Sequence, residues 1–95
     1  MKGLNGLMKQ AQQMQQKMAT LQKELETREL ETSSGGGMIK IKITGKQQIV
    51  SISINKECVD PNDVASLEDL VKTAVNQAVK ESQDMVSGAM SKITG

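Results

Sequence analysis

The chain has 95 residues, of which 37% are hydrophobic and none aromatic, and its formal net charge is +1. Because it contains no His and a single Cys, Cys58, one chain cannot build a disulfide, a Cys–His dyad or a zinc site, so we expect no cofactor, no metal and no enzyme. A chain this small, without aromatic side chains, disulfides or metal, usually gains stability by association, and we expect one domain, residues 1–95, in an obligate oligomer.

Charge is strongly segregated along the chain. Residues 1–25 carry four Lys and one Glu, whereas residues 57–70 carry five acids and no base. No apolar run approaches the roughly 18 residues of a membrane span, and the N-terminus lacks the apolar core of a signal peptide. We therefore expect a cytoplasmic protein with no membrane partner. The single cysteine, Cys58, is expected to be a small buried hydrophobic residue.

Residues 1–25 are predicted to form a helical arm. From Leu4 to Leu25 the apolar residues follow an unbroken heptad pattern. This pattern makes a narrow apolar seam, of the width that a single partner helix covers. Three lysines fall opposite this seam and Lys17 lies beside them, so the outer face of the helix is basic. The seam consists of Leu4, Leu7, Ala11, Met14, Met18, Leu21 and Leu25, and the basic face of Lys2, Lys9, Lys17 and Lys23.

Residues 27–55 are predicted to form a three-stranded antiparallel meander. Residues 27–34 read as a polar edge strand, and Gly35-Gly36 suits a two-residue hairpin turn because both residues accept positive φ. Taken literally, this turn places Leu30 opposite Ile41, Glu31 opposite Lys40 and Glu29 opposite Lys42, which would neutralise both lysines. Residues 38–44 and 49–55 alternate apolar and polar side chains, with Ile39, Ile41, Ile43, Val50, Ile52 and Ile54 expected to face inward.

A long C-terminal helix over residues 61–93 is predicted to cover the apolar face of this sheet. Asp60 and Pro61 suit its first turn, with Ser66 and Asp69 as an alternative capping pair. The small residues Ala74 and Ala78 allow close packing on the sheet. Because the helix is longer than the strands, its end should project, and the apolar stripe from Met85 to Ile93 should need a partner.

Several functions find no support in the residues. The glycine-rich segment SSGGG is not followed by the GxxxxGK[ST] pattern of a phosphate-binding loop. No nucleophile has an adjacent base and orienting group, so neither catalysis nor a small-molecule substrate is expected. The absence of Phe, Tyr and Trp removes the stacking platforms of RNA-binding and single-strand-binding folds.

Four segments together resemble a known family. Residues 7–18 (LMKQAQQMQQKM), 36–45 (GGMIKIKITG), 52–61 (ISINKECVDP) and 67–78 (LEDLVKTAVNQA) are similar, in order and spacing, to the YbaB/EbfC family of bacterial nucleoid-associated proteins. The resemblance covers nearly the whole chain. It implies an α+β subunit of order α-β-β-β-α, a homodimer with projecting helical arms, and binding to duplex DNA in the nucleoid.

The function expected from these observations is binding of double-stranded DNA by a homodimer through phosphate contacts, with little sequence specificity, as a nucleoid-associated protein that can influence gene expression. The candidate DNA contacts are Lys2, Lys9, Lys17 and Lys23, with Lys40, Lys42, Lys72, Lys80 and Lys92 in second rank. The expected dimer interface contains Leu4, Leu7, Met14, Met18, Leu21, Met85 and Met90.

Two other interpretations remain open. The methionine-rich seam could dock a helix of a different protein, since Met suits adaptable surfaces. The segment from Met1 to Lys17 could lie on a membrane surface, although it has no Trp or Phe anchor.

Overall fold

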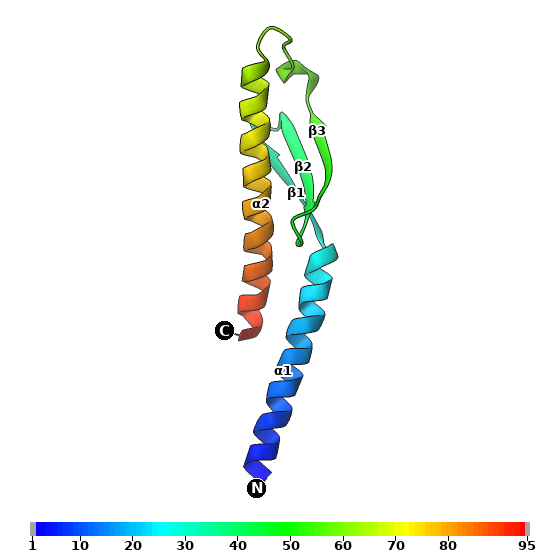
Figure 1. Cartoon of the computed structure of the whole chain (residues 1–95), viewed down its shortest axis with the longest axis vertical. Coiled ribbons are helices and arrows are strands. Elements are labelled where there is room, and N and C mark those ends of the chain that lie inside the picture. The colour runs from blue at the N-terminus through cyan, green and yellow to red at the C-terminus, as the bar shows by residue number, and fades with distance from the viewer. Residues whose placement is uncertain (1, 95) are drawn as a thin grey trace.

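One long helix lies alongside a three-stranded antiparallel sheet and another extends from one end of it, and both helices run roughly along the length of the molecule (Figure 1). The computed structural model describes residues 2–94 and the side chains of residues 3–93. The chain forms α1 (Lys2–Thr27), β1 (Glu29–Ser34), β2 (Ile39–Thr44), β3 (Ile49–Ile54), a 3-10 helix (Lys56–Cys58) and α2 (Val64–Thr94). The predicted α+β class and α-β-β-β-α order are therefore confirmed.

The core lies between α2 and the first two strands. Ile39, Ile41 and Ile43 of β2 alternate onto one face of the sheet and are fully buried, as are Ala74 and Ala78 of α2. Because an alanine side chain ends at Cβ, these two residues let the helix backbone approach the isoleucines closely. Leu30 of β1 and Leu70, Val71, Val75 and Val79 of α2 surround this cluster.

The first hairpin has a different register from the one predicted. Its loop includes Gly35, Gly36 and Gly37, with φ of 62°, 67° and 90°, followed by Met38, whose N–H donates to the Gly35 carbonyl at 3.3 Å. This longer loop moves the pairing by two residues, so the two predicted Glu–Lys pairs are wrong. Because side chains alternate with a period of two, an even shift leaves each on its predicted face. Leu30 now lies opposite Ile43, Glu31 opposite Lys42, and Ser33 opposite Lys40.

The third strand is not buried as predicted. Val50 of β3 is the extra residue of a bulge, because Lys42 and Ile43 of β2 pair with Ser51 and Ile49, so that Ile49 rather than Val50 lies opposite Ile43. Ile52 and Ile54 lie opposite Ile41 and Ile39 and so belong to the expected face, yet every residue of β3 is exposed. The reason is one of width. A helix with its side chains is about 10–12 Å across and strands are about 4.8 Å apart, so α2 covers β1 and β2 and leaves β3 bare.

The start of α2 also differs from the prediction. Neither predicted capping pair is used. Asp63, the residue before the helix, caps it by accepting from the Ser66 N–H at 3.3 Å and from its hydroxyl at 2.7 Å. Asp60 instead organises the preceding turn, where its carboxylate accepts from the Asn62 N–H at 2.9 Å. Cys58 is half-buried rather than buried, and its thiol donates to the Asn55 carbonyl at 3.0 Å.

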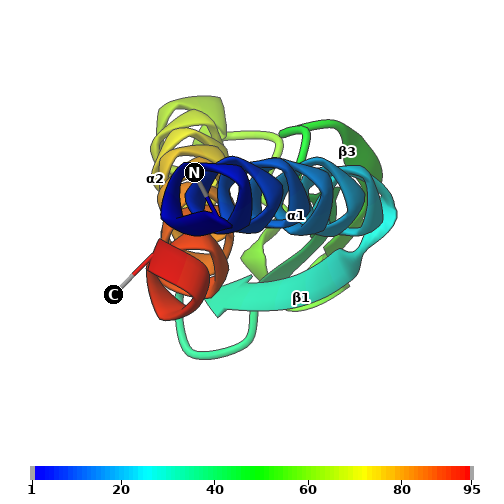
Figure 2. The same cartoon turned by 90° about the horizontal axis from the view of Figure 1, so that it is seen from below.

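The far end of α2 extends past the sheet, as predicted, but it meets α1 of the same chain (Figure 1). Met85, Val86, Ala89, Met90 and Ile93 are all half-buried. The second half of α1 therefore covers this stripe in part, and the expectation that a partner molecule also contacts it stays a prediction. Seen from the N-terminal end, α1 is inclined across the molecule, with its N-terminus on the side of α2 and its C-terminus on the side of the sheet (Figure 2).

Candidate nucleic-acid interface

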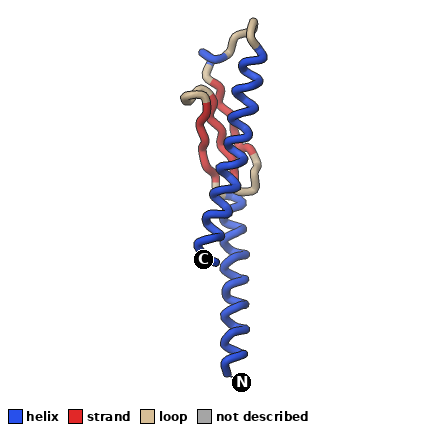
Figure 3. The backbone as a smooth tube through the Cα atoms, turned by 90° about the vertical axis from the view of Figure 1, so that its left-hand side faces the viewer, coloured by secondary structure: helices blue, strands red, loops and turns tan. Residues whose placement is uncertain are grey.

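The first half of α1 forms an arm that packs on nothing else in the described chain. It projects beyond the C-terminal end of α2, as Figure 3 shows, and gives the molecule a length of 75 Å against widths of 18 and 16 Å. The heptad seam is accordingly divided. Leu7 and Met14 are 64% and 41% exposed, whereas Met18 and Leu21 are half-buried beside α2 and Leu25 is fully buried.

The base of the arm is held by a close backbone contact. A Cβ placed on Gly45 would lie 2.0 Å from the carbonyl oxygen of Leu25, so only glycine permits this approach of the β2–β3 turn to the last turns of α1. The Gly45 N–H also donates to the Arg28 carbonyl at 3.1 Å. The orientation of the arm relative to the sheet is therefore set by backbone atoms rather than by adaptable side chains.

The lysines of α1 do not form one stripe. At 100° per residue, Lys9 and Lys23 lie only about 40° apart around the helix and about 21 Å apart along it, whereas Lys17 lies about 80° from Lys9. All three are exposed. Lys2 begins α1, and its side chain lies outside the described ones. Thus Lys9 and Lys23 share a face turned away from the seam, and Lys17 occupies a flank.

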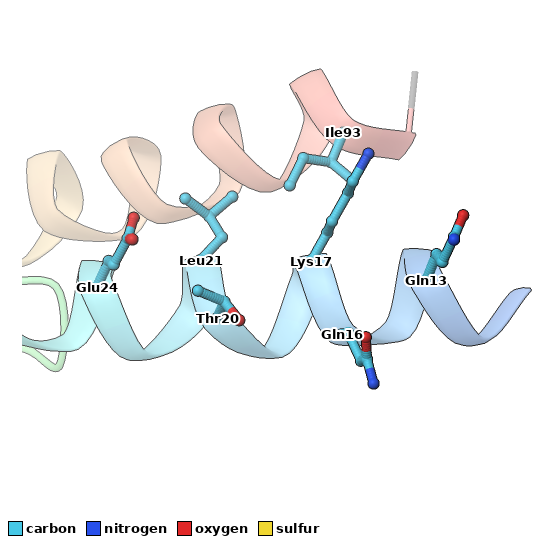
Figure 4. Close-up of a pocket in the computed structure, with 7 residues that line it drawn as sticks. All are labelled: Gln13, Gln16, Lys17, Thr20, Leu21, Glu24 and Ile93. Atoms are coloured by element: carbon cyan, nitrogen blue, oxygen red, sulfur yellow. The ribbon is translucent and has the colours of Figure 1, made fainter. Parts of the chain in front are cut away.

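Lys17 lines a groove where α1 meets the end of α2. In Figure 4 the side chains of Leu21, Glu24 and Lys17 point from α1 toward α2, and the Lys17 chain runs beside Ile93. Glu24 lies two turns from Lys17 along the same groove, so this lysine is less isolated from acids than Lys9. The lining residues are Gln13, Gln16, Lys17, Thr20, Leu21, Glu24 and Ile93.

A second, smaller group of lysines lies on the outer face of the sheet, opposite α2. Lys40 and Lys42 of β2 are exposed there and line a surface depression with Glu31, Ser51 and Ser53. The depression thus holds two positive charges and one negative charge. Lys40 is less neutralised than predicted, because the observed register places Ser33 rather than Glu31 opposite it.

The remaining candidates are scattered. Lys72 forms a salt bridge of 3.3 Å with Asp69, the only one in the described part of the chain, and Lys80 and Lys92 are exposed elsewhere on α2. Lys46 was not among the predicted DNA contacts, yet it lies in the β2–β3 turn beside Gln22 and Glu26 of α1. The sequence signal that could have indicated this position is the preceding Gly45, because a glycine in a turn often marks a close approach of two backbones.

The two charged segments lie at opposite ends of the molecule. The basic arm occupies one end of the 75 Å axis, and the acidic segment from Glu57 to Leu70, which includes the start of α2, occupies the other (Figure 1). At physiological salt the Debye length is about 8 Å, so the acidic end barely affects the potential at the arm. The net charge of +1 therefore says little about the electrostatic potential at the arm, which is set by its own lysines.

The described residues give no support for a metal site or a membrane-spanning helix. Over residues 2–94, no group of His, Cys, Asp and Glu side chains could hold a metal ion. Neither described helix is long and apolar enough to cross a membrane. The arrangement offers a charged helical surface rather than a pocket for chemistry.

Comparison with known proteins gives concordant matches. The family model described as the YbaB/EbfC DNA-binding family matches residues 1–95. A nucleoid-associated protein of Alkaliphilus oremlandii is 54% identical over 92 residues, which are 97% of this chain and 81% of the relative. A nucleoid-associated protein of Desulforamulus reducens is 53% identical over 97% of this chain and 88% of its own. The nucleoid-associated protein TTE0040 of Caldanaerobacter subterraneus is 49% identical over 97% of this chain and 83% of its own.

A solved structure has the same fold. The crystal structure of the uncharacterized protein HP0035 from Helicobacter pylori superposes with a TM-score of 0.72, covering 97% of this chain and 94% of the other. At 20% sequence identity the likeness establishes the fold alone.

Proposed function

The chain belongs to the YbaB/EbfC DNA-binding family, and on that premise we propose that it binds double-stranded DNA as a homodimer, chiefly through phosphate contacts made by the lysines of α1. The family is one of DNA-binding, nucleoid-associated proteins, so the chain is no enzyme. We place it in the nucleoid within the cytoplasm, where it binds with little sequence specificity and can influence gene expression. The observation that carries the proposal is the exposure of Lys9, Lys17 and Lys23 along α1, whose first half projects beyond the rest of the described chain.

Phosphate contact follows from the chemistry of the arm. An ammonium group is a compact charge that suits phosphate oxygens, whereas bidentate reading of guanine requires the planar fork of arginine. The chain has one arginine, Arg28, at the junction of α1 and β1, away from the arm. In addition, the N-terminus of α1 is the positive end of the helix dipole and lies at the tip. Both features favour binding to the DNA backbone over reading of bases.

A salt titration with matched double variants tests this proposal. Each phosphate contact contributes about 0.9 to the slope of log K against log salt, so removing two lysines from each subunit of a dimer lowers the slope by up to about 3.6. We expect that loss for Lys9→Gln/Lys17→Gln. Lys40→Gln/Lys42→Gln removes the same charge from the sheet and should change the slope less, because Glu31 lies opposite Lys42 and lines the same depression.

Gel shifts on one duplex between about 50 and 200 mM salt measure both slopes. A larger loss for the sheet variant would transfer the binding surface to the outer face of the sheet. If neither variant loses slope, Lys72, Lys80 and Lys92 become the candidates.

A protein-docking function is the alternative that one observation favours. Leu4, Leu7 and Met14 expose an apolar row along the arm, and such a row suits an amphipathic helix of another protein. Docking of that kind depends on apolar contact and should be nearly indifferent to salt. Binding to DNA that does not weaken across the same salt series would therefore favour this alternative.

A further inference from the structure

The arm divides into two parts that differ in helix-forming composition. Residues 2–6, the tip, have the sequence KGLNG, and residues 7–12, the shaft, have the sequence LMKQAQ. Every shaft residue is a good helix former, whereas two of the tip residues are glycine and one is asparagine. Each glycine lowers the helical population about fivefold relative to alanine, so the two together disfavour a helical tip about 25-fold. By composition, the tip is therefore the weakest part of the arm.

No other part of the described chain supports the tip. The side chains of residues 3–6 are all exposed, and a Cβ built on Gly3 or Gly6 meets no atom of another element within 4 Å. The groove between α1 and α2 begins at Gln13, about two turns further along the helix. Because most helical stability in proteins comes from packing of an apolar face, the tip depends on backbone hydrogen bonds that extend from the shaft.

Charge also opposes a helical tip. Lys2 stands at the positive end of the helix dipole, and the first turn of α1 contains no acidic residue. The first acid of the chain, Glu24, lies about 33 Å from Lys2 along the helix. In addition, the first four N–H groups of a helix have no intrahelical acceptor. Thus α1 itself supplies no negative charge near the tip.

We propose that the tip is only partly helical in the free protein and becomes fully helical on contact with DNA, so that helix formation and phosphate binding are coupled. Phosphates bring negative charge to the N-terminal end of α1, which is what the tip lacks. A ligand that interacts more strongly with the helical tip than with the frayed one shifts the population toward the helix. The helical tip of the structure is thus the DNA-binding conformation. This inference rests on the proposed binding of DNA through α1.

Coupling of this kind sets the affinity of the arm. The apparent affinity of a ligand falls in proportion to the fraction of the protein that is in the binding-competent conformation. Gly3 and Gly6 lower that fraction, so they hold the affinity below the value that a preformed arm with the same lysines would have. An arm that is already fully helical in the free protein would gain nothing from a better helix former. This difference separates the two cases.

Substitution of glycine by alanine tests the coupling without removing a DNA contact. Gly3 lies about 120° around the helix from Lys9, so the added methyl group points away from the lysine face. For Gly3→Ala we expect DNA binding to tighten up to about fivefold for each arm that contacts the duplex. Gly88→Ala is the matched control, since its Cβ position is equally open and packing of α2 on the sheet keeps that helix formed in both states. Its affinity should equal that of the wild type.

Gel shifts at one salt concentration measure these affinities on a duplex of about 24 base pairs, which at 3.4 Å per pair is longer than the 75 Å molecule. A Gly3→Ala affinity equal to or below that of the wild type would overturn the proposal. Equal tightening by Gly88→Ala would overturn it as well, because the effect would then be one of general stability.

Nuclear magnetic resonance provides a second test that observes the tip directly. In the free protein, the Cα chemical shifts of residues 3–6 should fall well short of the helical values of the shaft, and they should reach helical values when the same duplex is added. Fully helical shifts in the free protein, or shifts that bound DNA leaves unchanged, would contradict the coupling. If Lys9→Gln/Lys17→Gln loses salt slope while Gly3→Ala binds like the wild type, only the coupling fails. If the duplex does not bind at all, both proposals fail.

Discussion

Substitution of Gly45 by alanine should loosen the arm from the body of the protein. The added Cβ would lie 2.0 Å from the Leu25 carbonyl oxygen and 2.8 Å from its carbonyl carbon. Both of these atoms belong to the backbone, so no side-chain rotation relieves the clash. The end of α1 must move by about 1 Å or more, which disturbs the fully buried Leu25 side chain and the hydrogen bond from Gly45 to Arg28.

The expected loss of stability combines two effects. Overpacking of a closely packed site costs about 1–3 kcal/mol, and complete removal of a buried leucine side chain costs about 2–5 kcal/mol. Because Leu25 is displaced rather than removed, we expect a total near 3 kcal/mol, at the upper end of the overpacking range. At about 4–8 °C per kcal/mol for a domain of this size, the melting temperature should fall by about 12–24 °C.

Thermal melting followed by circular dichroism measures this change, at one protein concentration because association affects the midpoint. Gly88→Ala is the matched control, since a Cβ at Gly88 meets no atom within 4 Å and the residue lies inside α2. There alanine should raise stability by up to about 1 kcal/mol through its helix propensity. If Gly45→Ala melted within the error of the wild type, the inferred backbone contact between the β2–β3 turn and α1 would be wrong.

Three further substitutions probe other contacts. Ser82→Ala should lower the free energy of unfolding in urea by about 1–3 kcal/mol, because the buried Ser82 hydroxyl donates to the buried Thr44 carbonyl at 2.7 Å. The exposed Ser87→Ala should lower it by almost nothing, and equal effects would contradict a role for this hydrogen bond. Met18→Asp should lower the melting temperature clearly more than Met14→Asp, because only the former is half-buried beside α2; the reverse order would contradict the division of the seam. Asp69→Asn should change the free energy of unfolding by less than about 0.5 kcal/mol, since both side chains of the Asp69–Lys72 salt bridge are exposed. A larger loss in the same melts would contradict this weak contribution.

The order and type of the elements were within reach of the sequence because they depend on local patterns. A heptad from Leu4 to Leu25, strict alternation in IKIKI, and the 3.6-residue period from Leu70 to Ala78 each describe one element on its own. The clustering of Lys in residues 1–25 and of acids in residues 57–70 is likewise readable directly. These features led to the fold class and to the choice of α1 as the DNA-binding candidate.

Details that depend on atoms of two elements at once were not predicted correctly. Two adjacent glycines suggested a two-residue turn, but a loop of three glycines and Met38 closes the hairpin, and the strand register follows the loop. Likewise Asp60-Pro61 fits a helix start as well as Asp63 does, and the choice between them depends on a turn that Asp60 stabilises. Local preference leaves such alternatives nearly equal in free energy, so the surrounding structure selects among them.

The sequence by itself determined which residues are apolar, which are charged, and, apart from the bulge at Val50, on which face of its own element each one lies. Only the tertiary structure decided which of those apolar faces are covered. The stripe from Met85 to Ile93 and the isoleucines of β3 (Ile49, Ile52 and Ile54) are both apolar in sequence, yet α1 partly covers the first and nothing in the described chain covers the second. The physical reason is that burial depends on the width and direction of neighbouring elements. One helix is wide enough to cover two strands, and the second half of α1 runs beside the end of α2.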